Sequence, residues 1–234
     1  MGPAATLDFM SKIMALTPAK TDQEHLPMVV WSDPRVPDRT RAIVDFGSPS
    51  PVPLLKQGVA RLEALGATVI AIPCNTAHHW FRDIQLATKV PILHIADCAV
   101  AALLETGVST GTRVGIMGTN GTLASGFYQQ RLQQAGLTVV APSPDVQETL
   151  VMPSIRAVKS RNIPQAQDLA CRAALSLSQE GADAILLACT ELPVALAQYI
   201  SEFSFVDTTE SLARACVLYA RPDSIPAPRR GTDA

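Results

Sequence analysis

Two cysteines of this chain occupy the same sequence setting. Cys74 follows the apolar run 69–72, and Cys189 follows the apolar run 184–187. In both segments a Gly-Ala pair begins eight residues before the cysteine. A thiolate can remove a proton from carbon, and a thiol on the opposite face can return one, as inversion of a stereocentre requires. The pair therefore predicts an acid and a base that face each other across a cleft.

Polar residues follow each cysteine: Asn75 and Thr76 after the first, Thr190 and Glu191 after the second. Each cysteine is expected at the carboxyl end of a parallel strand, where open α/β sheets bind their ligands. If the polar residues open the next helix, their free backbone N–H groups favour an anionic carboxylate. The same field is expected to lower the pKa of each thiol from about 8.5 toward neutrality.

Other roles for cysteine stay open. A single catalytic cysteine would support decarboxylation or covalent catalysis, but it would leave the second one unexplained. Cysteine also serves as a small buried apolar side chain. We assign that packing role to the three cysteines in helical, Ala- and Leu-rich contexts: Cys98, Cys171 and Cys216.

Metal and nucleotide binding find less support. Zinc could in principle be bound by a set of four residues: Cys74, His78, His79 and Cys189. Their spacing is not that of a structural zinc site, and catalytic zinc more often uses histidine and carboxylate ligands. The sequence has neither a Gly-rich phosphate loop of standard spacing nor a G-x-S-x-G motif. We expect no metal and no cofactor, and a supporting or packing role for the two histidines.

Composition excludes several classes of function. The 234 residues are 47% hydrophobic and 17% charged, with a formal net charge of -2 and no block of like charges. This balance argues against binding of nucleic acid or of a membrane surface, because both need a basic patch. No signal peptide and no run of about 18 apolar residues is found. Five widely spaced cysteines indicate reduced thiols, and we expect a cytoplasmic protein.

Apolar runs alternate with helical patterns, which is typical of a parallel α/β sheet. Strands are predicted at 27–32, 69–72, 91–95, 113–117, 137–142, 184–187 and 203–206. Helices are predicted at 51–65, 99–105, 123–136, 164–180 and 210–219. The predicted fold class is α/β, with two pseudo-symmetric lobes that each consist of a parallel sheet flanked by helices. The active site is expected in the cleft between them.

The two halves of the chain align beyond the cysteines. Residues 1–7 match residues 117–123 at an offset of 116, and the two cysteines match at an offset of 115. A nearly constant offset supports a duplicated lobe. In the second half a strand at 113–116 precedes this match, whereas in the first half Met1 is the first residue. We therefore expect the first lobe to lack its opening strand and to have a gap or an unpaired sheet edge.

The repeat also predicts a domain organisation. We expect residues 1–96 together with 207–225 to form the first lobe, and residues 97–206 to form the second. Residues 226–234 are rich in proline, arginine and glycine, and we expect them to be a loose tail.

Two motifs around the cysteines carry a family resemblance. Residues 73–78, Pro-Cys-Asn-Thr-Ala-His, and residues 188–193, Ala-Cys-Thr-Glu-Leu-Pro, resemble the two signatures of the aspartate/glutamate racemase family. Residues 1–6 and the Pro-Asp-Arg-Thr segment at 37–40 resemble the aspartate racemase branch. Glutamate racemases proper are a poorer match, because they carry Cys-Thr-His at the second cysteine.

The resemblance implies a cofactor-independent amino-acid racemase that acts on aspartate, or on aspartate and glutamate. It implies that Cys74 and Cys189 are the acid/base pair and that the lobes enclose the substrate between them. The only partner implied is a small amino-acid substrate, with no nucleic acid and no membrane. By analogy with the family the protein is a homodimer.

The resemblance also implies a set of substrate-binding residues. Arg39 and Lys159 match the basic residues that neutralise a dicarboxylate in this branch. Thr119 and Thr122 lie in the loop that pairs with the start of the chain, where they would bind a carboxylate or cap a helix. Asn75, Thr76, Thr190 and Glu191 complete the predicted site.

Alternatives on the same scaffold are a broad-specificity amino-acid racemase, an arylmalonate-type decarboxylase and a maleate-type isomerase. Two cysteines together with two cations for a dicarboxylate disfavour the decarboxylase. A binding protein without catalytic activity is the non-enzymatic alternative, and it would be favoured if the first lobe could not close over a substrate.

Overall fold

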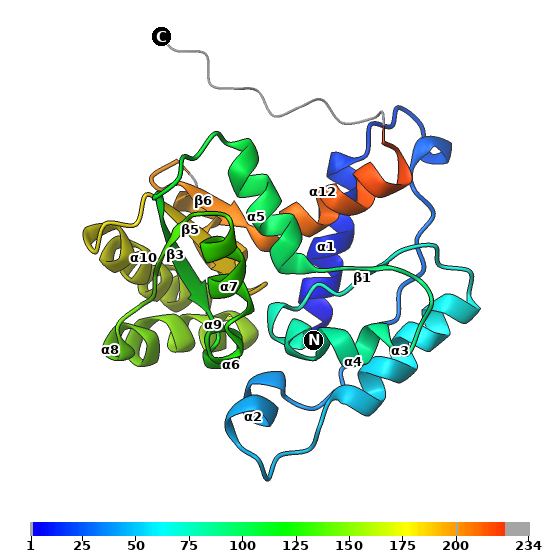
Figure 1. Ribbon diagram of the computed structural model, residues 1–234, viewed down its shortest axis with the longest axis horizontal. Helices are drawn as coiled ribbons and strands as arrows, with labels where there is room; N and C mark the ends of the chain where they lie inside the picture. The colour runs from blue at the N-terminus through cyan, green and yellow to red at the C-terminus, as the bar shows by residue number, and fades with distance from the viewer. Residues whose placement is uncertain (1, 200, 223–234) are drawn as a thin grey trace.

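The structure is a computed structural model that describes residues 2–199 and 201–222, and Figure 1 shows two lobes with α5 and α12 between them. The helices are α1 Pro3–Leu16, α2 Arg39–Val44, α3 Val52–Ala64, α4 Phe81–Gln85, α5 Ile95–Glu105, α6 Asn120–Ser125, α7 Phe127–Gln134, α8 Pro144–Val146, α9 Met152–Lys159, α10 Ile163–Gln179, α11 Leu192–Leu196 and α12 Thr208–Ala220. The strands are β1 Ile70–Ala71, β2 Ile92–Leu93, β3 Arg113–Gly118, β4 Thr138–Val140, β5 Ala184–Ala188 and β6 Phe205–Asp207. The predicted α/β fold class is confirmed.

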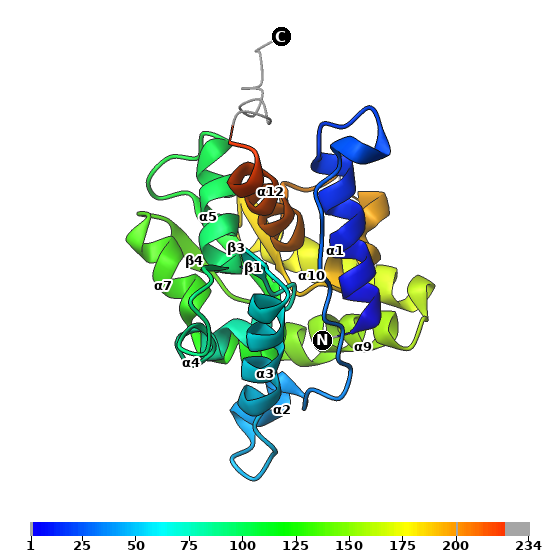
Figure 2. The ribbon, with the colours of Figure 1, turned by 90° about the vertical axis from the view of Figure 1, so that its right-hand side faces the viewer.

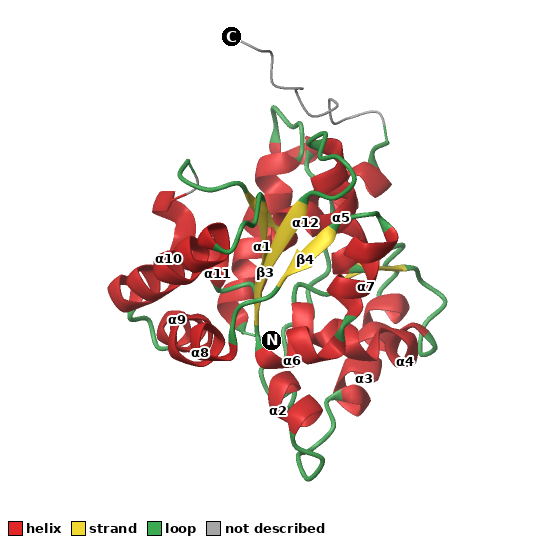
Figure 3. Ribbon diagram, turned by 60° about the vertical axis from the view of Figure 1, so that its left-hand side comes forward, coloured by secondary structure: helices red, strands yellow, loops and turns green. Residues whose placement is uncertain are grey.

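The second lobe has a four-stranded parallel sheet in the order β4-β3-β5-β6. The central strand β5 is buried along its whole length, and β3 is buried after Arg113, because helices cover both faces. Figure 3 shows α9, α10 and α11 on one side of the sheet and α7 on the other. Gly118 pairs with Ala188, so the loop after β3 leaves the sheet beside Cys189.

The first lobe has a two-stranded parallel sheet, in which Ile70 pairs with Ile92 and Ala71 pairs with Leu93. Apolar side chains of α3 and α4 pack against these strands; they are Leu55, Val59 and Ile84. Figure 2 shows α3 beside β1. Cys74 follows β1 as Cys189 follows β5, so each lobe carries one cysteine at the carboxyl end of a parallel strand.

The last helix packs on the first, as Figures 1 and 2 show. α1, α5 and α12 share an apolar cluster that contains Phe9, Ile95 and Leu212. The Lys12 ammonium bonds to Asp8 Oδ2 at 2.6 Å and to Asp207 Oδ2 at 2.7 Å, which links α1 to the start of α12. We keep the predicted division into 1–96 with 207–225 and 97–206 as a proposal. Its residues 223–225 and the tail 226–234 lie outside the described residues.

The predicted strand at 27–32 is wrong. This segment has no regular structure and pairs with no strand of the described chain. Its apolar side chains are partly exposed: Met28 38%, Val29 49%, Val30 43% and Trp31 38%. The apolar run is there, but a strand also needs a hydrogen-bonded neighbour, and the described residues supply none.

The predicted helix at 123–136 is divided. It begins earlier, at Asn120, and Gly126 breaks it into α6 and α7 by adopting a φ of 69°. The sequence did not predict α2 or α9, which carry Arg39 and Lys159. The packing roles are confirmed, since Cys98 and Cys216 join the cluster beneath α12 and Cys171 joins that around α10. None of the described helices is long and apolar enough to cross a membrane.

Candidate active site

A narrow cleft lies where the carboxyl ends of the two sheets meet, with a volume of about 30 Å³. Its walls are Gly2, Asp38, Arg39, Thr40, Pro73, Cys74, Asn75, Thr76, Thr119, Lys159, Cys189, Thr190 and Glu191. Every predicted site residue except Thr122 is therefore brought together here. The volume matches about one water molecule.

Cys74 reaches the cleft from the first lobe. It has an extended backbone, with φ -158° and ψ 103°, and it precedes a 3₁₀-helix at Asn75–Trp80. The sequence predicted a helix opening here, and the structure makes it a tight 3₁₀ turn in which Ala77 N–H bonds to the Cys74 carbonyl at 3.1 Å. The sulfur-bearing residue is half-buried. Cys74 is therefore held at the edge of a rigid turn.

Cys189 reaches the cleft from the second lobe and is only 6% exposed. Its thiol donates to Glu191 Oε2 at 3.0 Å, and the Thr190 hydroxyl donates to the same oxygen at 3.1 Å. Burial and the Glu191 carboxylate raise the pKa of the Cys189 thiol well above its usual range, while the Lys159 ammonium acts in the opposite direction. The expectation of a lowered pKa is wrong for Cys189, because burial and a fixed carboxylate outweigh a short helix terminus.

Arg39 is the first residue of α2, and Asp38 caps this helix by accepting from Arg41 N–H at 2.8 Å. The Arg39 Nη1 donates to the carbonyls of Val36 at 3.1 Å and Pro37 at 3.0 Å. Its Nε is buried and has no partner in the described chain. A buried unsatisfied donor carries a cost that a substrate carboxylate would remove. The Arg39 guanidinium is therefore anchored through Nη1, while its Nε has no hydrogen-bond partner in the described chain.

Three threonine hydroxyls form a closed ring between the lobes. Thr76 Oγ1 lies 2.8 Å from Thr119 Oγ1 and 3.0 Å from Thr122 Oγ1, and the latter two are 3.0 Å apart. Thr119 also caps α6 by accepting from Thr122 N–H at 3.1 Å. Thr122 is thus placed behind the cleft wall, where it supports the two threonines that line it.

The two lobes lie close together at Gly121. A Cβ atom at this position would lie 2.9 Å from the Cα of Thr40 and 2.9 Å from the Cγ2 of Thr76. Any side chain here would push the first lobe away. In the first half of the repeat the matching residue is Ala5, which has a side chain. This difference between the halves was the sequence signal that Gly121 makes a special contact.

The side chain of Asn75 forms hydrogen bonds within the protein. Its Oδ1 accepts from the Tyr128 hydroxyl at 2.5 Å, and its Nδ2 donates to Thr208 Oγ1 at 3.2 Å. Each of these two atoms can form one further hydrogen bond, so the Asn75 side chain is only partly occupied. The sequence gave no indication of Tyr128 or Thr208, because they lie 53 and 133 residues from Asn75.

The two histidines after Cys74 point away from it. The His78 ring bonds to the Ile72 carbonyl at 3.1 Å, and the His79 ring bonds to Ser125 Oγ at 3.0 Å. Burial lowers the pKa of His78 to about 3 and that of the neighbouring His94 to about 3. Within residues 2–199 and 201–222, no group of three or more His, Cys, Asp or Glu side chains could hold a metal ion.

Known proteins that resemble this chain in sequence and fold include racemases. The structure of the Picrophilus torridus aspartate racemase superposes with a TM-score of 0.81 at 32% identity, covering 94% of this chain and 90% of that one. An aspartate racemase homologue from Pyrococcus horikoshii OT3 superposes with a TM-score of 0.72 at 26% identity, covering 93% and 94%. The broad specificity amino-acid racemase RacX of Bacillus subtilis (strain 168) is 29% identical over 221 residues, 93% of each chain.

A match to a family profile supports the assignment to a family over most of the chain. The profile of the Asp/Glu/hydantoin racemase family matches residues 1–216, which is nearly all of the described chain. The match includes both cysteine motifs and every residue that lines the cleft. The chain belongs to the Asp/Glu/hydantoin racemase family and is an amino-acid racemase.

Proposed function

We propose that this racemase inverts aspartate, or aspartate and glutamate, by moving the α-proton between Cys74 and Cys189 without a cofactor. The observation that carries the proposal is the cleft itself. It presents one cysteine from each lobe together with two cations, Arg39 and Lys159. Two cations balance the second carboxylate of a dicarboxylic substrate and the negative charge that builds up at the α-carbon.

The protonation states follow from the surroundings of Cys189. Because the Glu191 carboxylate accepts its S–H, Cys189 starts as the acid, and Cys74 takes the role of base. The Cα–H bond breaks, its proton goes to Cys74, and its electron pair stays on the substrate as an enolate-like carbanion. The S–H bond of Cys189 then breaks, and its proton goes to the opposite face of the α-carbon.

The substrate carboxylates have distinct places. Arg39 offers its unpartnered Nε to the side-chain carboxylate, and an Arg fork suits a planar anion. The turn after Cys74 and the turn after Cys189 offer backbone N–H groups to the α-carboxylate. The hydroxyls of Thr76 and Thr119, at the cleft wall, complete a polar lining without adding charge.

The test is incubation with L-aspartate, L-glutamate and other amino acids in D₂O. We expect inversion accompanied by deuterium at the α-carbon, and we expect Cys74→Ser and Cys189→Ser each to abolish inversion. Cys171→Ser is the matched control, because Cys171 lies within α10 and does not line the cleft. Full inversion by either single variant of the pair would overturn the two-base mechanism.

Further arms of the same experiment separate the alternatives. Release of CO₂ from an arylmalonate with no inversion of amino acids would favour the decarboxylase. Inversion of many amino acids at similar rates would favour a broad-specificity racemase, and loss of activity with a chelator would favour zinc. Binding of aspartate without any exchange would favour the binding protein.

Two properties implied by the resemblance accompany the proposal. We expect a homodimer, to be checked by light scattering over a range of concentrations. We also expect a cytoplasmic location, to be checked by cell fractionation.

A further inference from the structure

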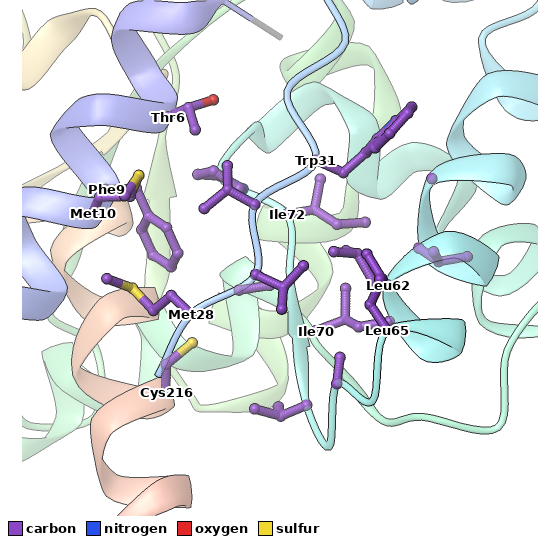
Figure 4. A pocket seen from close by; sticks show the side chains of 18 of the residues that line it. Thr6, Phe9, Met10, Met28, Trp31, Leu62, Leu65, Ile70, Ile72 and Cys216 are labelled. Atoms are coloured by element: carbon purple, nitrogen blue, oxygen red, sulfur yellow. The ribbon is translucent and has the colours of Figure 1, made fainter. Parts of the chain in front are cut away.

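The two walls of the cleft are supported in different ways. In the first lobe, the segment that leads to Cys74 borders a cavity of about 530 Å³. Figure 4 shows Ile70 and Ile72 of this segment on one side of the cavity and Phe9 of α1 on the other. In the second lobe, the loop that contains Thr119 is instead held by hydrogen bonds from a buried side chain.

That side chain is Gln147, which bonds to the residues on both sides of Thr119. Only 6% of Gln147 is exposed. Its Nε2 donates to the Gly118 carbonyl at 2.9 Å and to Asn120 Oδ1 at 2.7 Å. Gly118 ends β3 and Asn120 begins α6, so the loop is fixed where it leaves the sheet and where it enters the helix. Thr119, which lines the cleft, is held between these two bonds.

The partners determine the orientation of the Gln147 amide. Asn120 Nδ2 donates to Glu148 Oε1 at 2.6 Å, and a carboxylate can only accept, so Asn120 presents its Oδ1 to Gln147. The Gly118 carbonyl can also only accept. Gln147 therefore uses its Nε2 for both bonds, and its Oε1 is buried with no partner in the described chain. A buried unpaired carbonyl carries a cost that an apolar side chain would avoid, so the two donated bonds explain why a glutamine stands here.

The backbone that carries Gln147 is also unusual. Gln147 begins a π-helix, Gln147–Val151, which continues directly into α9. Turns of π-helix are rare and are frequently found at functional sites. α9 ends at Lys159, which lines the cleft. The same stretch of chain therefore supports the loop of Thr119 at its beginning and supplies a cation to the cleft at its end.

We propose that Gln147 is a positioning residue for racemisation, which holds the Thr119 hydroxyl at the cleft wall by bonding to Gly118 and Asn120. Gln147 does not itself line the cleft, so it acts through Thr119 and not on the substrate. The inference rests on the proposed function, in which the Thr119 hydroxyl is part of the polar lining that binds the substrate.

The test is Gln147→Met, which keeps the length of the side chain and removes both donated bonds. We expect KM for aspartate to rise about ten-fold with kcat nearly unchanged, because a binding group is displaced and the groups that move the proton are not. Where this variant does not fold, Asn120→Ala removes only one of the two bonds and should give a smaller rise in KM. An unchanged KM would overturn the proposal.

The matched control is Gln129→Met. Gln129 Nε2 also donates to a backbone carbonyl, that of Leu123 at 2.9 Å, and its Oε1 is likewise buried without a partner in the described chain. Gln129 lies on α7 and does not line the cleft. We expect its KM to equal that of the original chain, even where both variants lose the same amount of stability.

A double variant separates positioning from a general loss of structure. If Gln147 acts through Thr119, then Thr119→Val should raise KM less in the Gln147→Met background than in the original chain. The effects of Thr119→Val and Gln129→Met should simply add. Additive effects of Gln147→Met and Thr119→Val would overturn the proposal.

Amide exchange distinguishes failure of the proposal from failure of the proposed function. The amides of Thr122 and Leu123 bond to Thr119, so they should exchange about ten-fold faster in Gln147→Met and at the original rate in Gln129→Met. Equal exchange rates in the two variants would overturn the positioning role. Faster exchange in Gln147→Met, with no inversion of aspartate by the original chain, would support the hold on Thr119 and count against the proposed function alone.

Discussion

The thiol of Cys189 donates to Glu191 Oε2 at 3.0 Å, so one catalytic candidate is held in its protonated form by a residue two positions further on. Replacing Glu191 with glutamine removes the negative charge and keeps a similar shape. We expect the pKa of the Cys189 thiol to fall, because the neighbouring negative charge no longer disfavours the thiolate. Its alkylation by iodoacetamide at neutral pH should then become about ten-fold faster.

The control for that measurement is Glu63→Gln, which removes a partly exposed carboxylate on α3, away from the cleft. An unchanged alkylation rate in Glu191→Gln would mean that burial alone holds Cys189 protonated.

Arg39 should decide how well a second carboxylate is bound. Arg39→Gln removes the Nε donor that has no partner in the described chain, and it also removes the Nη1 bonds to the carbonyls of Val36 and Pro37. A hydrogen bond to a charged group contributes about 1.5–3 kcal/mol, so kcat/KM for aspartate should fall about 10- to 100-fold. Arg41→Gln is the control, since Arg41 is exposed and on the same helix. Equal losses in both variants would assign the effect to the charge of α2.

The threonine ring should behave as one unit. Thr76→Val keeps the shape of the side chain and removes one of the three hydroxyls. We expect a loss of about 1 kcal/mol in the free energy of unfolding. Thr119→Val should cost a similar amount, and the double variant should cost less than the sum, as measured by chemical denaturation. Strict additivity would show that the hydroxyls do not cooperate across the lobes.

Stability should depend on pH through the buried histidines. His78 and His94 have pKa values of about 3 in the folded chain, against about 6.5 when unfolded. Between these values the unfolded chain binds protons that the folded chain excludes, so stability falls as the pH is lowered from 6.5 toward 3. Each histidine contributes a slope of about 1.4 kcal/mol per pH unit.

The variant His94→Asn isolates this effect. Asparagine is a good helix cap and can replace the bond that His94 Nδ1 accepts from Ala96 N–H. We expect a shallower dependence on pH in urea unfolding between pH 6.5 and 4. His25→Asn, at an exposed position, should keep the slope of the original chain. A slope that His94→Asn leaves unchanged would assign the acid sensitivity to other groups.

Much of the architecture could be predicted because the determinants are local. The apolar runs of β3 and β5 mark buried parallel strands, and the cysteines follow strands in both halves of the repeat. Arg39 and Lys159 were identified through the family motifs, and the structure places both at the cleft.

The remaining features depend on contacts between distant parts of the chain. The segment 27–32 has the composition of a strand, but strand pairing is decided by its neighbours, and none is found in the described residues. The raised pKa of Cys189 arises from burial and from the direction in which Glu191 points. Neither can be read from the order of residues alone.

The hydrogen bonds of Asn75 have a consequence for the spacing of the two sulfur atoms. Asn75 directly follows Cys74, and its amide is held by Tyr128 of α7 and by Thr208 at the start of α12. Thr208 in turn donates to the Leu187 carbonyl of β5, two residues before Cys189. These hydrogen bonds therefore fix the position of Cys74 relative to β5, the strand that also positions Cys189. The spacing of the two sulfur atoms is thereby tied to the four-stranded sheet as well as to β1, the strand that precedes Cys74.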